Sequence, residues 1–299
     1  MRLVLIHNPG SGDDDHAGEH LIDLLVRAGH RVTYYKSNTL WHPALDDNPD
    51  LLVVAGGDGT VGEVARAAAS RNIPITILPI GTANNIAGYL GLSGTPLEVL
   101  VDGWARASLR PLDLGVARGP WGTNRFLESV GVGLLANLIS EIDAGRASYV
   151  NELDGRNARL TAALEVLERV LKRSTPLTCE IELDDLQLSG QYLLIEILNF
   201  GAAGPNLPLA PHADGADGVL DIALVEARER PWLQQHVSDI RKNPSSVTPL
   251  RVHHARRVTL RCEPCAVHLD DEMWAPDDKN IWVEASAEHA ALTFLIPPV

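Results

Sequence analysis

Residues 56–59 (Gly-Gly-Asp-Gly) follow an apolar run, 51–55, that is typical of a buried parallel strand. Their glycines allow a sharp turn and a close approach of a ligand to the backbone. The amides at the start of the helix expected over 60–71 favour an anion, and a phosphate suits them best. Asp58 would repel a phosphate unless a cation lies between them, so the pattern favours a magnesium-bound nucleotide. A plain strand–turn–helix corner, with Asp58 as a cap, explains the same residues about equally well.

Two more predicted strands end in loops of the same kind. Strand 2–6 leads into 7–12 (His-Asn-Pro-Gly-Ser-Gly), and strand 73–79 leads into 81–87 (Gly-Thr-Ala-Asn-Asn-Ile-Ala). The carboxyl ends of parallel strands share one edge of a sheet, where ligands bind, so three such loops favour a nucleotide site more strongly than one. The acidic run 13–15 argues against this site, because three carboxylates oppose a triphosphate unless they cap the following helix.

Two acidic segments in the second half of the chain contain further candidates. Residues 214–221 (Asp-Gly-Ala-Asp-Gly-Val-Leu-Asp) combine acids, glycines and carbonyls, which suits an oxygen-ligand metal loop, although Asp-Gly pairs are equally standard in turns. Residues 270–272 (Asp-Asp-Glu) lie at the end of a predicted strand. A buried member of this triplet would suit a general base. When the triplet is considered alone, surface acids in a turn explain it better.

Strands and helices alternate up to about residue 108, and short strands with Gly, Asp and Pro turns dominate the remainder. The pattern predicts an α/β nucleotide-binding domain with a Rossmann-like parallel sheet over 1–108 and a β-sandwich domain over 109–299. A helical insertion is expected at about 134–174, with an apolar stripe that favours packing on the sandwich over a membrane-facing lid. A return of the last strand to the first domain is left open. The strands expected in the second domain are 109–117, 125–131, 177–184, 187–199, 218–226, 256–262, 266–270, 280–285 and 290–296.

Composition restricts the class of partner. The 299 residues carry a net charge of −14, which argues against nucleic acid and against broad adhesion to anionic lipid. No apolar run approaches the roughly 20 residues of a membrane span, and the N-terminus is too short for a signal h-region. Three cysteines fit a reducing compartment, and the lone Cys262-x-x-Cys265 pair is interpreted as structural. The sequence therefore predicts a cytoplasmic protein.

Taken together, these segments resemble the diacylglycerol kinase catalytic family, which includes bacterial lipid kinases and sphingosine kinases. The resemblance covers almost the whole chain in the right order. The Gly-Gly-Asp-Gly-Thr element is shared with NAD kinases and phosphofructokinases, whereas the full series is more specific. The matching elements are 8–12 (Asn-Pro-x-Ser-Gly), 56–63 (Gly-Gly-Asp-Gly-Thr-x-x-Glu), 79–84 (Pro-x-Gly-Thr-Ala-Asn), 113–115 (Asp-Leu-Gly), 217–221 (Asp-Gly-x-Leu-Asp) and 271–272 (Asp-Glu).

The resemblance implies a nucleotide-binding α/β domain followed by a β-sandwich, with ATP and Mg²⁺ as cofactors. It makes Glu272 the proton acceptor, with Asp271 as its close competitor and Asp58 as a further catalytic acid. The acceptor would take the proton from a lipid hydroxyl as that oxygen attacks the γ-phosphate. The residues implied to hold ATP are Asn8, Pro9, Gly10, Ser11, Gly12, Gly57, Asp58, Gly59, Thr60, Glu63, Thr82 and Asn84. The residues implied to hold Mg²⁺ are Asp217, the carbonyls of Asp214 and Val219, and Asp113 in an acidic network.

Three features of the sequence depart from the family pattern. Asn85 stands where the family commonly has Asp, Asp271 stands where it often has Gly, and the acidic run 13–15 replaces basic residues. These changes bear more on the identity of the acceptor than on phosphoryl transfer from ATP.

We therefore expect an ATP- and magnesium-dependent kinase that phosphorylates a hydroxyl of a diacylglycerol-like or sphingoid lipid. Such a protein would be cytoplasmic or peripheral at the membrane, with transient contact to the membrane surface and no nucleic-acid partner; a homodimer is left open. One alternative is a kinase of a soluble acceptor, similar to NAD kinases. A second is a catalytically weak nucleotide-binding protein, which Asn85 and the acidic run would explain.

Overall fold

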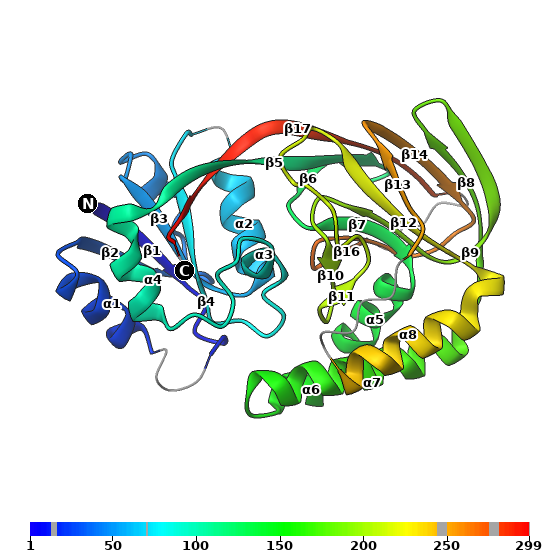
Figure 1. The fold of residues 1–299 in the computed structure, drawn as a ribbon, viewed down its shortest axis with the longest axis horizontal. Helices are drawn as coiled ribbons and strands as arrows, with labels where there is room; N and C mark the ends of the chain where they lie inside the picture. Colours follow the sequence, from blue (N-terminus) through cyan, green and yellow to red (C-terminus); the bar gives the residue numbers. More distant parts are fainter. Residues whose placement is uncertain (13–16, 70, 244–249, 275–280, 299) are drawn as a thin grey trace. The chain divides into compact units, whose positions relative to one another are not determined.

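The chain forms two compact units (Figure 1). The computed structural model describes residues 1–12, 17–69, 71–243, 250–274 and 281–298, so the acidic run 13–15 lies outside the described residues. The first unit comprises Met1–Leu114 together with His289–Val299, and the second comprises Gly115–Glu288. Two strands, β5 (Ser108–Gly119) and β17 (Ile281–Ile296), contribute residues to both units.

The first unit is an α/β structure in which strands and helices largely alternate. Its elements are β1 (Arg2–His7), α1 (Gly18–Arg27), β2 (Arg31–Lys36), β3 (Leu51–Gly56), α2 (Asp58–Ala68), β4 (Ile75–Pro79), α3 (Asn85–Tyr89) and α4 (Leu97–Gly103). Two 3₁₀ turns lie at His42–Leu45 and Trp104–Arg106. Its parallel sheet has the strand order β4-β3-β1-β2. β3 is buried along its whole length, which explains its continuous apolar sequence. The pair Phe294–Ile75 adds the end of β17 in parallel beside β4.

The strand register brings three loops to one edge of this sheet. His7 pairs with Ala55, and Gly56 pairs with Pro79, so β1, β3 and β4 end side by side. The chain leaves these strands through the three Gly-containing loops that the sequence singles out. Parallel pairing therefore gathers residues that are more than 70 positions apart in the chain at one place in the first unit.

The second unit is an antiparallel β structure with the strands β6 (Gly122–Phe126), β7 (Ser129–Gly133), β8 (Leu177–Leu183), β9 (Leu186–Leu198), β10 (Ala202–Ala203), β11 (Leu207–Pro208), β12 (Leu220–Glu226), β13 (Val252–Ala255), β14 (Arg257–Cys262), β15 (Val267–Leu269) and β16 (Glu272–Trp274). The main path runs β16-β15-β7-β9-β8-β14-β17, with β12 paired to β9 and β13, and β6 paired to β5. Burial alternates along β8, whereas all three residues of β15 are buried. A polar side chain on β15 therefore needs a partner inside the unit.

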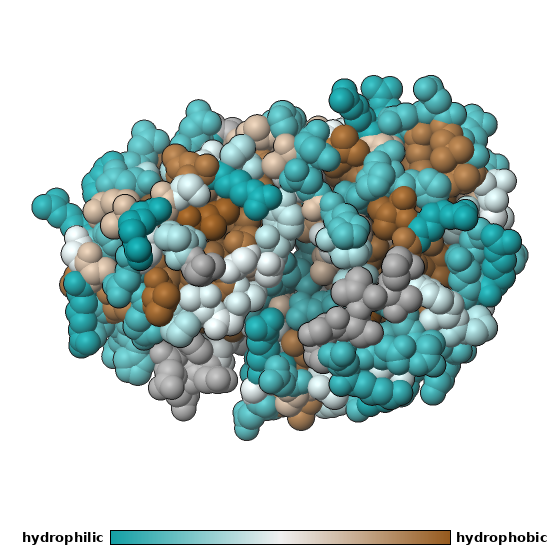
Figure 2. Space-filling model, in the orientation of Figure 1, coloured by the Kyte–Doolittle hydropathy of each residue, from teal (hydrophilic) through white to brown (hydrophobic). Residues whose placement is uncertain are grey.

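Four helices of the described chain pack on this β structure: α5 (Leu134–Asp143), α6 (Tyr149–Glu152), α7 (Arg156–Arg173) and α8 (Arg230–Lys242). A 3₁₀ turn at Ala227–Glu229 precedes α8. The α7 side chains Leu164, Leu167 and Leu171 belong to a core cluster that also contains residues of β9, β12 and α8. α7 and α8 run side by side, and hydrophilic residues dominate their visible surface (Figures 1 and 2). The apolar stripe of the helical insertion therefore packs inward.

Three features of the second half differ from the expected elements. The strand expected at 125–131 is two strands, β6 and β7, because the chain turns between them. The strands expected at 280–285 and 290–296 are one continuous strand, β17. The centre of β17 is polar, and there the amide of Ala290 donates to the carboxylate of Asp113 at 2.7 Å. Helix α8 is not anticipated from the sequence.

The start of α8 has a local signal that could have predicted it. Glu226 and Glu229 form a capping box before the helix, and Pro231 occupies its first turn. The buried side chains Leu233, Val237 and Ile240 then follow at helical spacing.

Candidate active site

The Gly-Gly-Asp-Gly corner is a point of very close backbone packing in the first unit. Gly57 is the N-cap of α2, and a Cβ added to it would lie 3.2 Å from the Cα of Gly81. A Cβ added to Gly81 would overlap the Cα and amide nitrogen of Gly57. The loops after β3 and β4 therefore meet glycine to glycine. Amides in the first turn of a helix lack backbone acceptors, which makes a corner of this kind suitable for phosphate oxygens, although in α2 the amide of Asp58 donates to its own carboxylate.

The loop after β1 is fastened to the same corner through Asn8. Its backbone amide donates to the carbonyl of Ala55 at 2.9 Å, and its side-chain Oδ1 accepts from the amide of Gly10 at 2.9 Å. Its Nδ2 donates to the Oγ1 of Thr60 at 3.3 Å. Three predicted nucleotide-binding residues thus form one hydrogen-bonded group at the start of α2.

Asn84 organises the loop after β4. This residue is 3 % exposed and adopts a left-handed backbone conformation with φ 56°. Its Nδ2 donates to the carbonyls of Pro79 and Gly81 at 3.2 and 2.9 Å. Thr82 lies half-buried in the same loop, and Glu63 lies half-buried one turn along α2 from Thr60. The predicted ATP-binding residues that the structure describes in this unit all belong to these three loops and α2.

Asp58 connects two of these loops. Its Oδ1 accepts the amide of Ile86 at 2.9 Å, and the amides of Asn85 and Asn84 also donate to this carboxylate. Asp58 is the first residue of α2, yet it caps the start of α3. Burial raises the pKa of Asp58, and these backbone amides act in the opposite direction. The side chain therefore has a structural task in addition to any role near a phosphate.

Asp113 is fully buried on β5 in the first unit. Its Oδ1 accepts the amide of Ala290 at 2.7 Å and lies 2.9 Å from Nδ1 of His289. Ala290 has a left-handed φ of 52°, so the carboxylate stabilises an unfavourable backbone conformation in β17. Within the described ranges, no group of three or more His, Cys, Asp or Glu side chains is arranged to hold a metal ion. A metal at any predicted site would need backbone carbonyls or water as additional ligands.

The acidic loop before β12 is a compact turn in the second unit. The Asp217 amide donates to the carbonyl of Asp214 at 3.3 Å, and the Asp217 Oδ1 accepts the amide of Val219 at 2.9 Å. Asp221, which is 4 % exposed, lies 2.9 Å from Nδ1 of His254. Burial raises the pKa of Asp221 to about 6; His254 counteracts this shift, and the charges of Asp217 and Asp214 add to it. A cation bound at this loop would relieve that repulsion.

The turn between β15 and β16 carries the three candidate acids 270–272. Asp270 has a left-handed φ of 48°, and its carboxylate accepts the amides of Leu127, Glu128 and Ser129 at 2.8 to 3.3 Å. Asp271 and Glu272 are exposed. Asp270 thus holds the turn through its contacts with the backbone. Asp271 and Glu272, the two candidates for the base, are not the buried acid that the sequence pattern favoured for this role.

Below this turn lies a buried pair, His268 and Glu196, for which the sequence analysis predicts no role. His268 on β15 is 2 % exposed and Glu196 on β9 is 0 % exposed. The Nε2 of His268 lies 2.9 and 3.1 Å from the two carboxylate oxygens of Glu196. The available signal is a glutamate within the apolar run 193–198, because such a residue inside a buried strand needs a partner.

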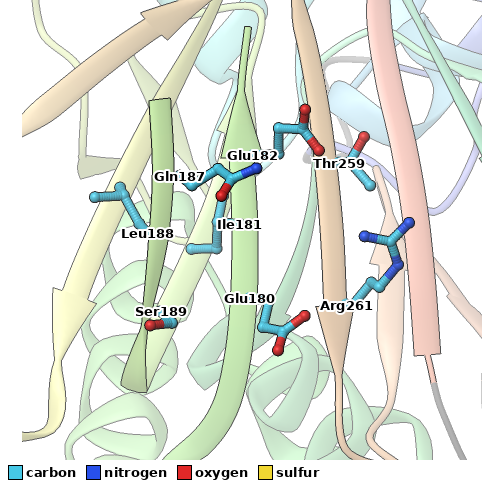
Figure 3. Close-up of a pocket in the computed structure, with 8 residues that line it drawn as sticks. All are labelled: Glu180, Ile181, Glu182, Gln187, Leu188, Ser189, Thr259 and Arg261. Atoms are coloured by element: carbon cyan, nitrogen blue, oxygen red, sulfur yellow. The ribbon is translucent and has the colours of Figure 1, made fainter. Parts of the chain in front are cut away.

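A pocket on the exposed face of β8, β9 and β14 is separate from these residues (Figure 3). Glu180, Glu182 and Arg261 point into it from neighbouring strands, and it contains none of the predicted site residues. The residues predicted from the sequence lie in the three loops, α2 and β5 of the first unit and in the two acidic turns of the second.

Both halves of the chain match known domains. Residues 2–117 match the diacylglycerol kinase catalytic domain, and residues 136–287 match the YegS C-terminal NAD kinase beta sandwich-like domain. The chain belongs to the diacylglycerol kinase family of lipid kinases. It is therefore a phosphotransferase that acts on an alcohol group.

Individual relatives of this lipid kinase agree with the assignment. A diacylglycerol kinase of Mycobacterium tuberculosis is 26% identical over 288 residues, which cover 94% of this chain and 86% of the relative. A diacylglycerol kinase structure from Bacillus anthracis str. Sterne has a TM-score of 0.71 at 20% identity and covers 99% of this chain and 97% of its own. An NAD kinase from Archaeoglobus fulgidus, in complex with ATP, has a TM-score of 0.58 at 11% identity and covers 98% of this chain and 93% of its own.

These similarities confirm the family resemblance and the predicted fold class of an α/β domain followed by a β-sandwich. Among the residues that the structure describes, the helices do not combine the length and the apolar composition that a membrane span requires.

Proposed function

We propose that this lipid kinase transfers the γ-phosphate of ATP to a hydroxyl of a diacylglycerol-like or sphingoid lipid, with Mg²⁺ as the metal. The observation that carries the proposal is the glycine-to-glycine contact between Gly57 and Gly81 at the start of α2, in a chain of the diacylglycerol kinase family. A side chain at Gly81 would collide with the backbone of Gly57 and force the two loops apart, which would disturb the corner that we propose to hold the phosphates.

In this proposal the first unit holds the nucleotide. The first-turn amides of α2 face the phosphates, and Asn8, through its bonds to Gly10 and Thr60, keeps the β1 loop beside them. The residues assigned to ATP are those predicted from the sequence, from Asn8 to Gly12, Gly57 to Thr60, Glu63, Thr82 and Asn84. Asp58 orients the third loop through the amides at the start of α3.

We assign Mg²⁺ to Asp217 together with the carbonyls of Asp214 and Val219. We assign Asp113, in the first unit, to the acidic network that the family resemblance implies for Mg²⁺. The donor set fits a hard cation, because it consists of carboxylate and carbonyl oxygens. When bound, magnesium supplies neutralisation of negative charge. Asp221 supports the assignment: burial is the main cause of its raised pKa, and the charges of Asp217 and Asp214 add to it, a repulsion that a cation at this loop would offset.

We assign proton removal from the acceptor hydroxyl to Glu272. Glu272 is exposed at the first position of β16, where a substrate can reach it, whereas Asp270 is half-buried and its carboxylate accepts three backbone amides. Asp271 is the competing candidate, because it is also exposed. If Asp271→Asn lowers kcat more than Glu272→Gln does, the base is Asp271.

The acceptor class is tested by radiolabelled phosphoryl transfer from ATP to mixed micelles. The panel contains diacylglycerol, monoacylglycerol, sphingosine and ceramide, with NAD in solution as the soluble alternative. We expect a labelled lipid and no labelled NADP. Labelled NADP without labelled lipid would favour an NAD kinase-like function, for which the structural likeness to the Archaeoglobus NAD kinase is the supporting observation.

Binding without turnover would favour the weak nucleotide-binding protein suggested by Asn85. The backbone amide of Asn85 donates to the carboxylate of Asp58, so Asn85→Asp adds a second carboxylate near that of Asp58. We expect the wild-type protein to turn over without this change. An inactive wild-type protein together with an active Asn85→Asp variant would contradict that expectation.

We also propose that the protein contacts membrane surfaces only transiently, because its substrate is a lipid and its net charge is −14. Co-sedimentation with vesicles of phosphatidylcholine and diacylglycerol measures this contact. Binding that needs diacylglycerol supports the proposal, and tight binding to vesicles without it contradicts the proposal.

A further inference from the structure

The pair formed by Glu196 and His268 spans an intervening strand. β15 pairs with β7, where His268 is opposite Gly131, and β7 pairs with β9, where Gly131 is opposite Glu196. The two charged side chains are therefore two strands apart and meet over the glycine between them. A Cβ at Gly131 would overlap the carboxylate of Glu196. The space for this ion pair thus depends on a residue without a side chain.

The hydrogen bonds of His268 extend from Glu196 to the candidate base turn. Its Nε2 faces the Glu196 carboxylate, and its Nδ1 lies 2.9 Å from the carbonyl oxygen of Asp270. A carboxylate and a carbonyl both accept, so a doubly protonated imidazolium satisfies them together. Burial lowers the pKa of His268, but the Glu196 charge, its hydrogen bond and the Asp270 carbonyl outweigh this effect and raise it overall.

The surroundings of His268 contain few other charges. Besides Glu196, the carboxylate of Asp270 acts on it from its own turn. The paired positions on the adjacent strands are Gly131 on β7 and Met273 on β16, neither of which titrates. α5 also packs against β15, and its acids Glu141 and Asp143 lie in its last turns, where Glu141 is bound to Arg146 and Arg173.

A buried ion pair is a costly way to stabilise a fold. Well-packed apolar residues of similar size are often as stable or more stable, because two charges must be removed from water. The hairpin turn itself does not require the pair, since Asp184–Asp185 forms a turn of the same kind between β8 and β9 over exposed Glu182. The pair at β15 therefore calls for a role other than closing the hairpin.

We propose that Glu196 and His268 are positioning residues for phosphoryl transfer, which hold the carbonyl of Asp270 and thereby fix the place of Glu272. The inference rests on the proposed role of Glu272 as the base. Glu272 is two residues beyond the carbonyl that His268 holds, at the start of β16. A shift of the turn moves its carboxylate away from the acceptor hydroxyl, and a displacement of about 1 Å can cost on the order of 100-fold in rate.

The test compares His268→Gln with His268→Asn and with Glu182→Gln. Glutamine keeps a donor near the Nε2 position for Glu196 and loses the one for the Asp270 carbonyl, whereas asparagine keeps a donor near the Nδ1 position. We expect His268→Gln to lower kcat by about 10- to 100-fold with the KM for ATP changed less than about threefold. We expect His268→Asn to recover part of kcat and Glu182→Gln to behave as wild type.

Folding of each variant is checked by circular dichroism and thermal unfolding. If His268→Gln does not fold, Glu196→Gln/His268→Gln is used, since it removes both charges and leaves no buried ion unpaired. The same loss of kcat is expected. Wild-type kcat in a folded His268→Gln or double variant, with Glu272→Gln inactive, overturns the inference and leaves the proposed function intact. Full activity of Glu272→Gln instead overturns the proposed base, and the inference with it.

Discussion

Two hairpin turns of the second unit share one design and differ in what lies beneath them. The turns Asp184–Asp185 and Asp270–Asp271 each follow a leucine, and their first aspartates have φ values of 49° and 48°. Each of these aspartates donates its amide to a carbonyl of a neighbouring strand, Arg257 in one case at 3.0 Å and Ser129 in the other at 2.8 Å.

The carboxylates of the two turns also act alike. Asp184 accepts the amides of Arg256 and Arg257 at 3.1 and 2.9 Å, just as Asp270 accepts consecutive amides before β7. Two residues before the turn, however, the first hairpin has exposed Glu182 and the second has buried His268. The Leu-Asp-Asp pattern therefore specifies a turn, and the buried side chains below it decide whether that turn has a further role.

The largest expected difference concerns two glycines: Gly131 on β7, beside the β15–β16 hairpin, and Gly190 on β9, within the β8–β9 hairpin. Gly131→Ala places a Cβ in the carboxylate of Glu196 and separates it from His268, and breaking a buried ion pair destabilises a protein by about 3–5 kcal/mol. Gly190→Ala on β9 places its Cβ at 3.4 Å from the ring of Tyr192, an ordinary contact, and is expected to change stability by less than about 1 kcal/mol. Urea unfolding measures both; equal losses would contradict the comparison.

A smaller difference is expected for the turn aspartates. Asparagine tolerates the left-handed conformation, so Asp270→Asn and Asp184→Asn remove the charge without straining the turn. Hydrogen bonds to a charged group contribute about 1.5–3 kcal/mol, and the half-buried Asp270 is expected to lose more than the exposed Asp184. Only Asp270→Asn is expected to lower kcat. Equal kcat values in both variants would show that the two turns are functionally equivalent.

The smallest expected effect is a pH dependence of stability. The raised pKa of His268 means that its contribution is fully present below 6.5, its unfolded value, and is lost as the pH rises through its folded value. The free energy of unfolding of the wild type, measured relative to that of Glu196→Gln/His268→Gln, should therefore decrease as the pH increases. Glu182→Gln provides the control. A difference that moves in the opposite direction would mean that His268 is neutral in the folded protein.

The sequence predicted those features that depend on local pattern. Gly57 and Gly81 each lie one or two residues beyond the end of a parallel strand, so their position at one sheet edge follows from parallel pairing. The apolar stripe of α7 likewise indicated its buried face. The contact between the two glycines needs the structure, because it depends on the distance between two loops.

The features that the sequence missed depend on pairing between distant strands. Glu196 and His268 meet because β7 lies between β9 and β15, and no local pattern specifies that order. The continuity of β17 depends on Asp113, which is 177 positions away from Ala290. In both cases the sequence shows a polar residue within a buried strand. It does not show which distant residue is the partner.

The most direct test of the central claim is single-turnover transfer of radiolabelled γ-phosphate to a lipid by Glu272→Gln, with MgATP binding measured by calorimetry. General-base catalysis contributes about 10²- to 10⁴-fold, so we predict a rate loss in this range with ATP affinity unchanged. Asp185→Asn, at the other hairpin, is predicted to retain the wild-type rate. Wild-type transfer by Glu272→Gln would contradict the account, because the acceptor hydroxyl would then lose its proton to another group.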